Sequence, residues 1–164
     1  TLMQLLVEFA NSKLEKICRN NVRVIILGDL QGLPAYAEEA LSKLMKKTSG
    51  NTGLTLNLCI NYGSRWEIID AVKNLSALVK SGNLEIEDID EKIFAQHLST
   101  KDMPDPELMI RTSGEQRLSN FLLWQLAYSE LYFTDVYWPD FREAELLKAV
   151  YCYQHRDRRF GGVK

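Results

Sequence analysis

The sequence is poor in residues that mark specialised classes of protein. It has three cysteines among 164 residues, Cys18, Cys59 and Cys152, and none stands in a Cys-x-x-Cys pair. This spacing argues against a disulfide framework or a cysteine zinc site, and it indicates reduced structural thiols in a cytoplasmic protein. The two histidines, His97 and His155, are too few for a histidine-rich metal centre.

An excess of one charge and long apolar runs are also lacking. The 20 basic and 22 acidic residues leave a formal net charge of −2, so we expect no nucleic-acid partner and look only for local basic sites. No apolar run approaches the roughly 20 residues that a transmembrane helix needs, and there is no signal-peptide pattern. Without a linker, repeat or low-complexity tract, residues 1–164 are expected to form a single domain.

The beginning of the chain predicts a helix. Apolar residues recur at helical spacing from Leu2 to Leu14, and Thr1 and Gln4 have the spacing of a capping box. The chain has no initial methionine, and an α/β domain more often begins with a strand. We therefore expect that a segment preceding Thr1 is missing.

Short apolar stretches then alternate with helical patterns. The predicted strands cover residues 22–27, 54–60, 108–110 and 131–133. The predicted helices run from Pro34 through Met45, from a Ser64–Glu67 capping box through Leu78, around Ile93, Phe94 and Leu98, through 121–126, and over 143–153. This alternation implies right-handed crossovers and an α/β fold, with an open parallel sheet and helices on both faces.

The third predicted strand delivers Arg111 into a Thr-Ser-Gly turn, and Arg117 and Ser119 stand where the next helix is expected to begin. Ligands of open parallel sheets bind beyond the carboxyl ends of the strands. Two guanidinium groups, a hydroxyl and free helix N–H groups there would bind a phosphate or diphosphate. In the plainer interpretation, Arg111 pairs with Glu115 or Asp105 and Ser119 only caps a helix; the grouping favours an anion site.

Three further positions leave two interpretations open. Glu130 precedes the fourth strand and is either a Mg²⁺ ligand near the diphosphate or a surface carboxylate paired with a Lys or Arg. Asn61, in Asn-Tyr-Gly-Ser-Arg after the second strand, either lines the same cleft or belongs to a turn. The basic end, with Arg159 and Gly161, is either a solvated tail or an arm that reaches an anion site.

These blocks resemble the signature motifs of the undecaprenyl diphosphate synthases, a family of cis-prenyltransferases. The resemblance covers essentially the whole chain. It rests on residues 105–120, on Tyr-Ser-Glu-Leu at 128–131, on Trp-Pro-Asp-Phe at 138–141, on Asn-Tyr-Gly at 61–63 and on Arg-Phe-Gly at 159–161.

The resemblance implies a homodimeric, Mg²⁺-dependent enzyme. Such an enzyme condenses isopentenyl diphosphate onto an allylic diphosphate, such as farnesyl diphosphate, to make a long-chain cis-polyprenyl diphosphate used as a precursor of the lipid carrier in cell-wall synthesis. It also implies that Arg111, Arg117 and Ser119 hold the diphosphate of isopentenyl diphosphate, and that Glu130 helps to hold Mg²⁺ by way of the neighbouring subunit. Arg159 and Gly161 would reach the same diphosphate across the dimer. Any membrane contact would be peripheral, through the lipid product.

Two departures from the family pattern stand out. Ser64 replaces a second glycine after Asn-Tyr-Gly, which affects the expected cleft geometry but not the resemblance. The family's opening strand and its loop with the catalytic Asp have no counterpart here, so we expect the chain to be the C-terminal two-thirds of an active synthase and to be inactive alone. The alternative is a non-catalytic partner subunit of a heteromeric cis-prenyltransferase, against which the complete set Arg111, Arg117, Ser119 and Glu130 argues.

Overall fold

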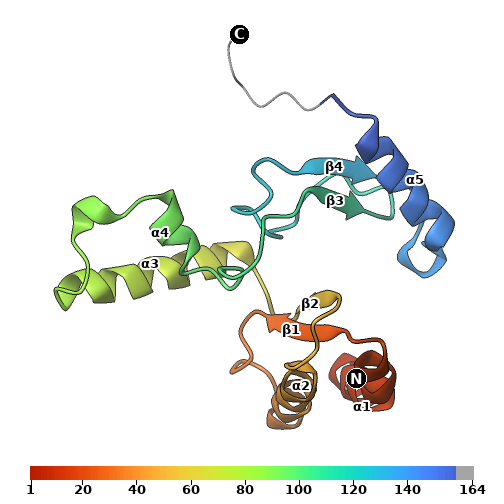
Figure 1. The fold of residues 1–164 in the computed structure, drawn as a ribbon, viewed down its shortest axis with the longest axis horizontal. Coiled ribbons are helices and arrows are strands. Elements are labelled where there is room, and N and C mark those ends of the chain that lie inside the picture. The colour runs from red at the N-terminus through yellow and green to blue at the C-terminus, as the bar shows by residue number, and fades with distance from the viewer. Residues whose placement is uncertain (158–164) are drawn as a thin grey trace. The chain divides into compact units, whose positions relative to one another are not determined.

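The computed structural model describes residues 1–157. The chain divides into two compact units, Thr1–Asp102 and Met103–Lys164. Each unit contains one pair of parallel strands, and each is described by itself (Figure 1). The predicted α/β class with parallel strands is therefore confirmed.

The first unit begins with two helices packed on a strand pair. α1 (Leu2–Arg19) is followed by β1 (Arg23–Leu27), α2 (Ala35–Thr48) and β2 (Thr55–Cys59). β1 and β2 are parallel, with Arg23 opposite Thr55 and Leu27 opposite Cys59. Val24 and Ile26 point to one face of β1, where they form a core with Ala10 of α1 and with Leu41 and Leu44 of α2. Both helices therefore cover this face (Figure 1).

The remainder of the first unit is mainly helical. α3 (Ser64–Lys80) follows β2, and a short 3₁₀ turn η1 (Ile86–Asp88) leads to α4 (Glu91–Ala95). The capping box predicted at Thr1 and Gln4 of α1 is confirmed. The one predicted at Ser64 and Glu67 is wrong, because α3 is capped at Gly63 without a side-chain hydrogen bond and Ser64 is fully buried.

The second unit contains β3 (Leu108–Arg111), β4 (Glu130–Phe133), the 3₁₀ turn η2 (Trp138–Asp140) and α5 (Glu143–Gln154). β3 and β4 are parallel, with Leu108 opposite Glu130 and Arg111 opposite Phe133. These strands and α5 agree with the predicted elements to within about two residues, which is the usual uncertainty of element ends. Within residues 1–157, no helix is long and apolar enough to cross a membrane.

The helix predicted through residues 121–126 is absent from this part of the structure. Ser119, Asn120 and Leu122 have φ angles of 50°, 63° and 45°, in the left-handed region. That conformation interrupts the repeated hydrogen bonds of a right-handed helix, so the segment forms separate turns. Of the apolar residues that suggested a helix, Leu126 is buried, whereas Phe121 and Leu123 are exposed.

Candidate functional site

Arg111 and Arg117 line the same hollow in the second unit. Arg111 ends β3, and Arg117 follows six residues later on the loop. The hollow has a volume of about 210 Å³, and its other walls are apolar side chains: Met109, Ile110, Leu118 and Phe121. Two permanent positive charges beside an apolar wall suit a small ligand that carries both an anionic and a hydrocarbon part.

A tight turn returns the chain from Arg111 toward this hollow. Ser113 and Gly114 have φ angles of 69° and 70°, and left-handed backbone at two successive residues reverses the chain direction. The turn is held by backbone hydrogen bonds from Ser113 N to Val136 O and from Gly114 N to Thr134 O, both 2.9 Å. The predicted Thr-Ser-Gly turn is confirmed.

The surroundings of Arg117 and Ser119 differ from the sequence interpretation. Arg117, and not Arg111, forms an ion pair with Glu115. Ser119 lies in left-handed backbone at an exposed turn, so it caps no helix, and the expected helix N–H groups are absent because no helix begins there. Any anion held at this hollow would therefore be bound by the guanidinium groups and the loop, without a helix terminus.

Glu130 lies at the opposite end of the strand pair from Arg111. It begins β4 opposite Leu108, three residues before the position opposite Arg111, which corresponds to roughly 10 Å along the strand. Within one chain, then, the Glu130 carboxylate does not join the hollow lined by the two arginines.

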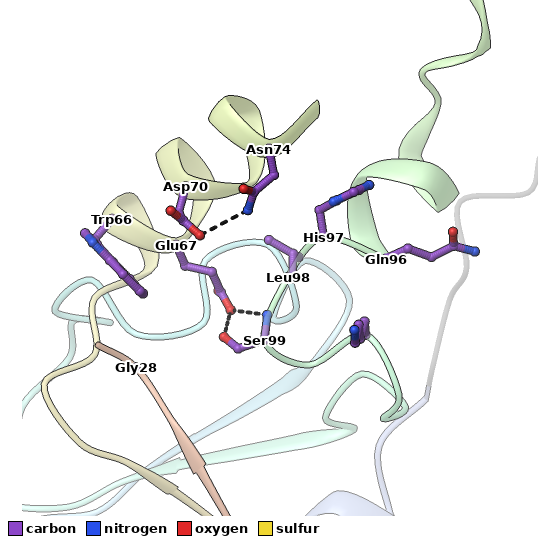
Figure 2. Close-up of a pocket in the computed structure, with 10 residues that line it drawn as sticks. Gly28, Trp66, Glu67, Asp70, Asn74, Gln96, His97, Leu98 and Ser99 are labelled. Carbon is purple, nitrogen blue, oxygen red and sulfur yellow. Dashed lines mark hydrogen bonds between the residues drawn. The ribbon is translucent and has the colours of Figure 1, made fainter. Parts of the chain in front are cut away.

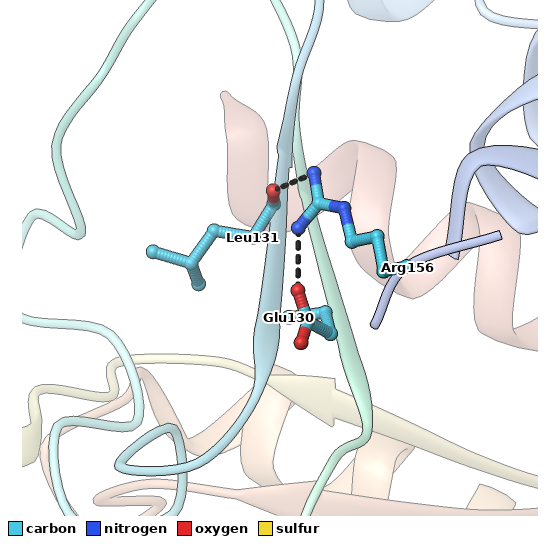
Figure 3. Close-up of polar contacts among 3 residues, drawn as sticks. All are labelled: Glu130, Leu131 and Arg156. Atoms are coloured by element: carbon cyan, nitrogen blue, oxygen red, sulfur yellow. Dashed lines mark hydrogen bonds and ion pairs between the residues drawn. The ribbon is translucent and has the colours of Figure 1, made fainter. Parts of the chain in front are cut away.

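Glu130 has a cationic partner. Arg156 Nη1 donates to Glu130 Oε2 at 2.6 Å, and Arg156 Nη2 donates to the Leu131 carbonyl oxygen at 2.9 Å (Figure 3). The side chains of Arg156 and Glu130 are 38% and 25% exposed, so water reaches the pair. This is the pairing with a nearby Arg that the sequence left open as one alternative.

The oxygen atoms of Glu130 and Leu131 that contact Arg156 also decide whether Glu130 fits a Mg²⁺ ion. No three His, Cys, Asp or Glu side chains gather as a metal site within residues 1–157. Mg²⁺ is, however, commonly held by one or two carboxylates together with substrate phosphates and water. Glu130 Oε2 and the Leu131 carbonyl are hard oxygen donors that already face one cation, the Arg156 guanidinium, so Glu130 fits a site of that kind.

In the first unit, Asn61 joins the ends of β1 and β2. Its side-chain Nδ2 donates to the backbone oxygen of Asp29 at 2.9 Å, and its backbone carbonyl oxygen accepts from Asp29 N at 3.2 Å. Gly28, which follows the last residue of β1, has φ 124°, and a Cβ there would lie 2.2 Å from Ile60 O. Asn61 thus takes part in the turn, and its role in substrate binding stays a prediction.

A buried carboxylate that was predicted to belong to a capping box lies beside this turn. Glu67 of α3 is only 3% exposed. Its Oε2 accepts from the Tyr62 hydroxyl at 2.6 Å. Its Oε1 accepts from Ser99 N at 2.9 Å and from the Ser99 hydroxyl (Figure 2). Glu67 thereby ties α3 both to the Asn-Tyr-Gly turn and to the loop after α4. In the sequence, only its position four residues after the Asn-Tyr-Gly motif hinted at this.

The carboxylate changes the titration of its neighbours. Burial raises the pKa of the Tyr62 phenol, and the hydrogen bond to Glu67 and its negative charge raise it further. Burial also raises the pKa of the Cys59 thiol, and the charge of Glu67 adds to this effect. Both groups therefore stay protonated and uncharged at neutral pH. Arg159 and Gly161, the remaining predicted site residues, lie outside the described residues.

Comparison with known proteins shows where this arrangement of motifs belongs. A family model described as "Putative undecaprenyl diphosphate synthase" matches residues 1–161. The chain belongs to the undecaprenyl diphosphate synthase family. An isoprenyl transferase of Bacillus anthracis is 51% identical over 162 residues, which are 99% of this chain and 63% of that protein. The chain therefore spans less than two-thirds of this relative's length.

Two other proteins are similar to this chain. A ditrans,polycis-undecaprenyl-diphosphate synthase of Pasteurella multocida, described as (2E,6E)-farnesyl-diphosphate specific, is 47% identical over 99% of this chain and 68% of its own length. The crystal structure of lavandulyl diphosphate synthase from Lavandula x intermedia, in complex with dimethylallyl diphosphate, has a TM-score of 0.95 at 40% identity. It covers 98% of this chain and 70% of that one. The predicted family and the α/β fold are confirmed.

Proposed function

We propose that the full-length protein containing this chain is a cis-prenyltransferase. It condenses isopentenyl diphosphate onto an allylic diphosphate of the farnesyl type and forms a long-chain cis-polyprenyl diphosphate such as undecaprenyl diphosphate. Family membership supports the class of reaction. The described relatives support the substrate class, since one is named for farnesyl diphosphate and another was solved with dimethylallyl diphosphate.

The observation that carries the proposal is the hollow lined by Arg111 and Arg117. A diphosphate pairs with guanidinium groups through charge-assisted hydrogen bonds, and the apolar walls of the hollow suit a five-carbon isoprenoid group. In this proposal Arg111 and Arg117 bind the diphosphate of isopentenyl diphosphate, with contributions from Ser119, Asn61, Arg159 and Gly161. Holding the phosphates positions the hydrocarbon end for attack on the allylic substrate.

We propose that Glu130 holds Mg²⁺ in a site shared between two copies of the chain. Its position at the end of the β3–β4 pair opposite Arg111 supports this arrangement, because one chain does not bring the carboxylate to its own arginine hollow. When bound, Mg²⁺ offsets negative charge on the departing diphosphate. The working protein is accordingly a homodimer in the cytoplasm, with peripheral membrane contact through its lipid product.

Substitution of Arg117 in the full-length protein tests the proposal. Arg117→Ala removes one guanidinium, and we expect the KM for isopentenyl diphosphate to rise about ten- to hundred-fold, the usual effect of losing a hydrogen bond between charged groups. Arg23→Ala is the matched control, since Arg23 is exposed at the amino end of β1. Incorporation of labelled isopentenyl diphosphate is the measurement.

Each outcome of that experiment is informative. Unchanged kinetics in Arg117→Ala would remove the anion site. If the purified full-length protein is inactive and gains activity only when a second protein is added, the non-catalytic partner subunit becomes the correct interpretation.

A further inference from the structure

In the second unit, the Glu130 carboxylate has two alternative cationic partners. The Glu130 carboxylate is the proposed Mg²⁺ ligand, and in the described structure it is held by Arg156, immediately after α5. Arg156 makes two hydrogen bonds here, because its second terminal nitrogen donates to the Leu131 carbonyl oxygen (Figure 3). The guanidinium therefore contacts one carboxylate oxygen of Glu130 and the carbonyl oxygen of Leu131.

A positively charged group and a divalent cation cannot occupy these oxygens equally well together. An ion pair is close to neutral, so a dication gains less from Glu130 while Arg156 stays in place, and the two cations repel at contact distance. The pair is partly exposed to water, and exposed ion pairs are weak. A weak ion pair of this kind can be displaced by an ion of higher charge.

We propose that Arg156 and Mg²⁺ compete for Glu130, so that binding of the metal with diphosphate releases Arg156. This inference rests on the proposed function.

The test measures metal binding and not turnover. Mn²⁺ replaces Mg²⁺ as the probe, and electron paramagnetic resonance reports free Mn²⁺ during a titration of the full-length protein in the presence of inorganic diphosphate. Competition predicts that Arg156→Gln tightens Mn²⁺ binding by about two- to five-fold, the range expected for loss of a weak ion pair. Arg156→Lys keeps the charge but loses the two-pronged contact, so an intermediate value is expected.

Two further variants make the result specific. Lys148→Gln removes an equal charge from an exposed position of α5 and should leave the Mn²⁺ affinity unchanged. Glu130→Gln should weaken Mn²⁺ binding. Thermal unfolding of each variant shows that it is folded.

The outcomes separate this inference from the proposed function. If Glu130→Gln weakens binding and Arg156→Gln leaves it unchanged or weaker, Glu130 is a metal ligand but the competition is refuted. If neither substitution alters Mn²⁺ binding, the metal role of Glu130 fails and the competition fails with it. Tighter binding in Arg156→Gln, lost when Glu130→Gln is added, supports the proposal.

Discussion

Thr48 shows how a single hydroxyl connects two elements of the first unit. Its side chain is fully buried at the end of α2. The hydroxyl oxygen accepts from Val24 N of β1 at 3.1 Å, and the hydroxyl donates to Leu44 O at 2.9 Å. The strand's buried N–H group is thereby satisfied by a helix side chain, which fixes α2 against β1.

We predict that Thr48→Val lowers the free energy of unfolding by about 1–3 kcal/mol, because the buried Val24 N–H group loses its acceptor. Thr52→Val is the matched control, since Thr52 is exposed and accepts a hydrogen bond from Asn21 at the surface. The control should lose less than about 1 kcal/mol. Denaturant unfolding gives both values, and equal losses would contradict the role assigned to Thr48.

The raised pKa of Tyr62 predicts that the free energy of unfolding depends on pH. This pKa is higher in the folded than in the unfolded protein, chiefly through burial and then through Glu67. The folded state therefore holds this proton more tightly, and its contribution is complete below about pH 10 and is lost as pH rises beyond that value. Tyr62→Phe should make the decline in unfolding free energy above about pH 10 less steep. Tyr128→Phe, at an 86% exposed position, serves as the control, and identical slopes would refute the assignment.

At the scale of elements, the ends of the strands determine where functional loops can lie. β1 and β2 end side by side, and Asn61 joins the two turns that follow them. In the second unit, the left-handed Ser113 and Gly114 turn the chain back so that Arg117 lines the hollow with Arg111. Both arrangements depend on backbone geometry at one or two residues.

Gly28→Ala is predicted to destabilise the turn after β1 by more than about 2 kcal/mol, since Gly28 combines a left-handed φ with a 2.2 Å approach of the added Cβ to Ile60 O. Gly50→Ala is the control, because a Cβ there meets nothing within 4 Å. We expect the control to be neutral or slightly more stable. A comparable loss at both glycines, measured by denaturant unfolding, would contradict this account.

At the scale of the whole molecule, the second unit exposes large apolar side chains. Trp138 of η2 is 72% exposed and stacks on Phe141 with ring centroids 6.1 Å apart. Leu147 and Tyr151 of α5 are 59% and 62% exposed. Apolar surface of this kind favours burial against another protein surface, which supports the proposed homodimer.

We predict that Leu147→Glu raises the dimer dissociation constant of the full-length protein by about ten-fold or more, because it places a charge in an apolar contact. Asn11→Glu adds the same charge at an exposed polar position of α1 and should have no effect. Sedimentation velocity over a concentration series measures the change. A dimer unaffected by Leu147→Glu would exclude this part of α5 from the interface.

In the sequence by itself, the resemblance of its motif blocks indicated the family. Periodicity determined the α/β class and most elements, because buried strands and amphipathic helices impose local patterns on the sequence. Local pattern did not reveal the turns at 119–122, since the apolar spacing of this segment suits a helix whereas three of its residues have left-handed backbone. It also could not show that Glu67 is buried against Tyr62 and Ser99, or that Glu130 faces Arg156. The Glu67–Ser99 and Glu130–Arg156 contacts join residues that are 32 and 26 positions distant in the sequence, whereas Tyr62 and Glu67 are close. Only tertiary structure decides such pairings, because burial and partner choice are properties of the packed chain.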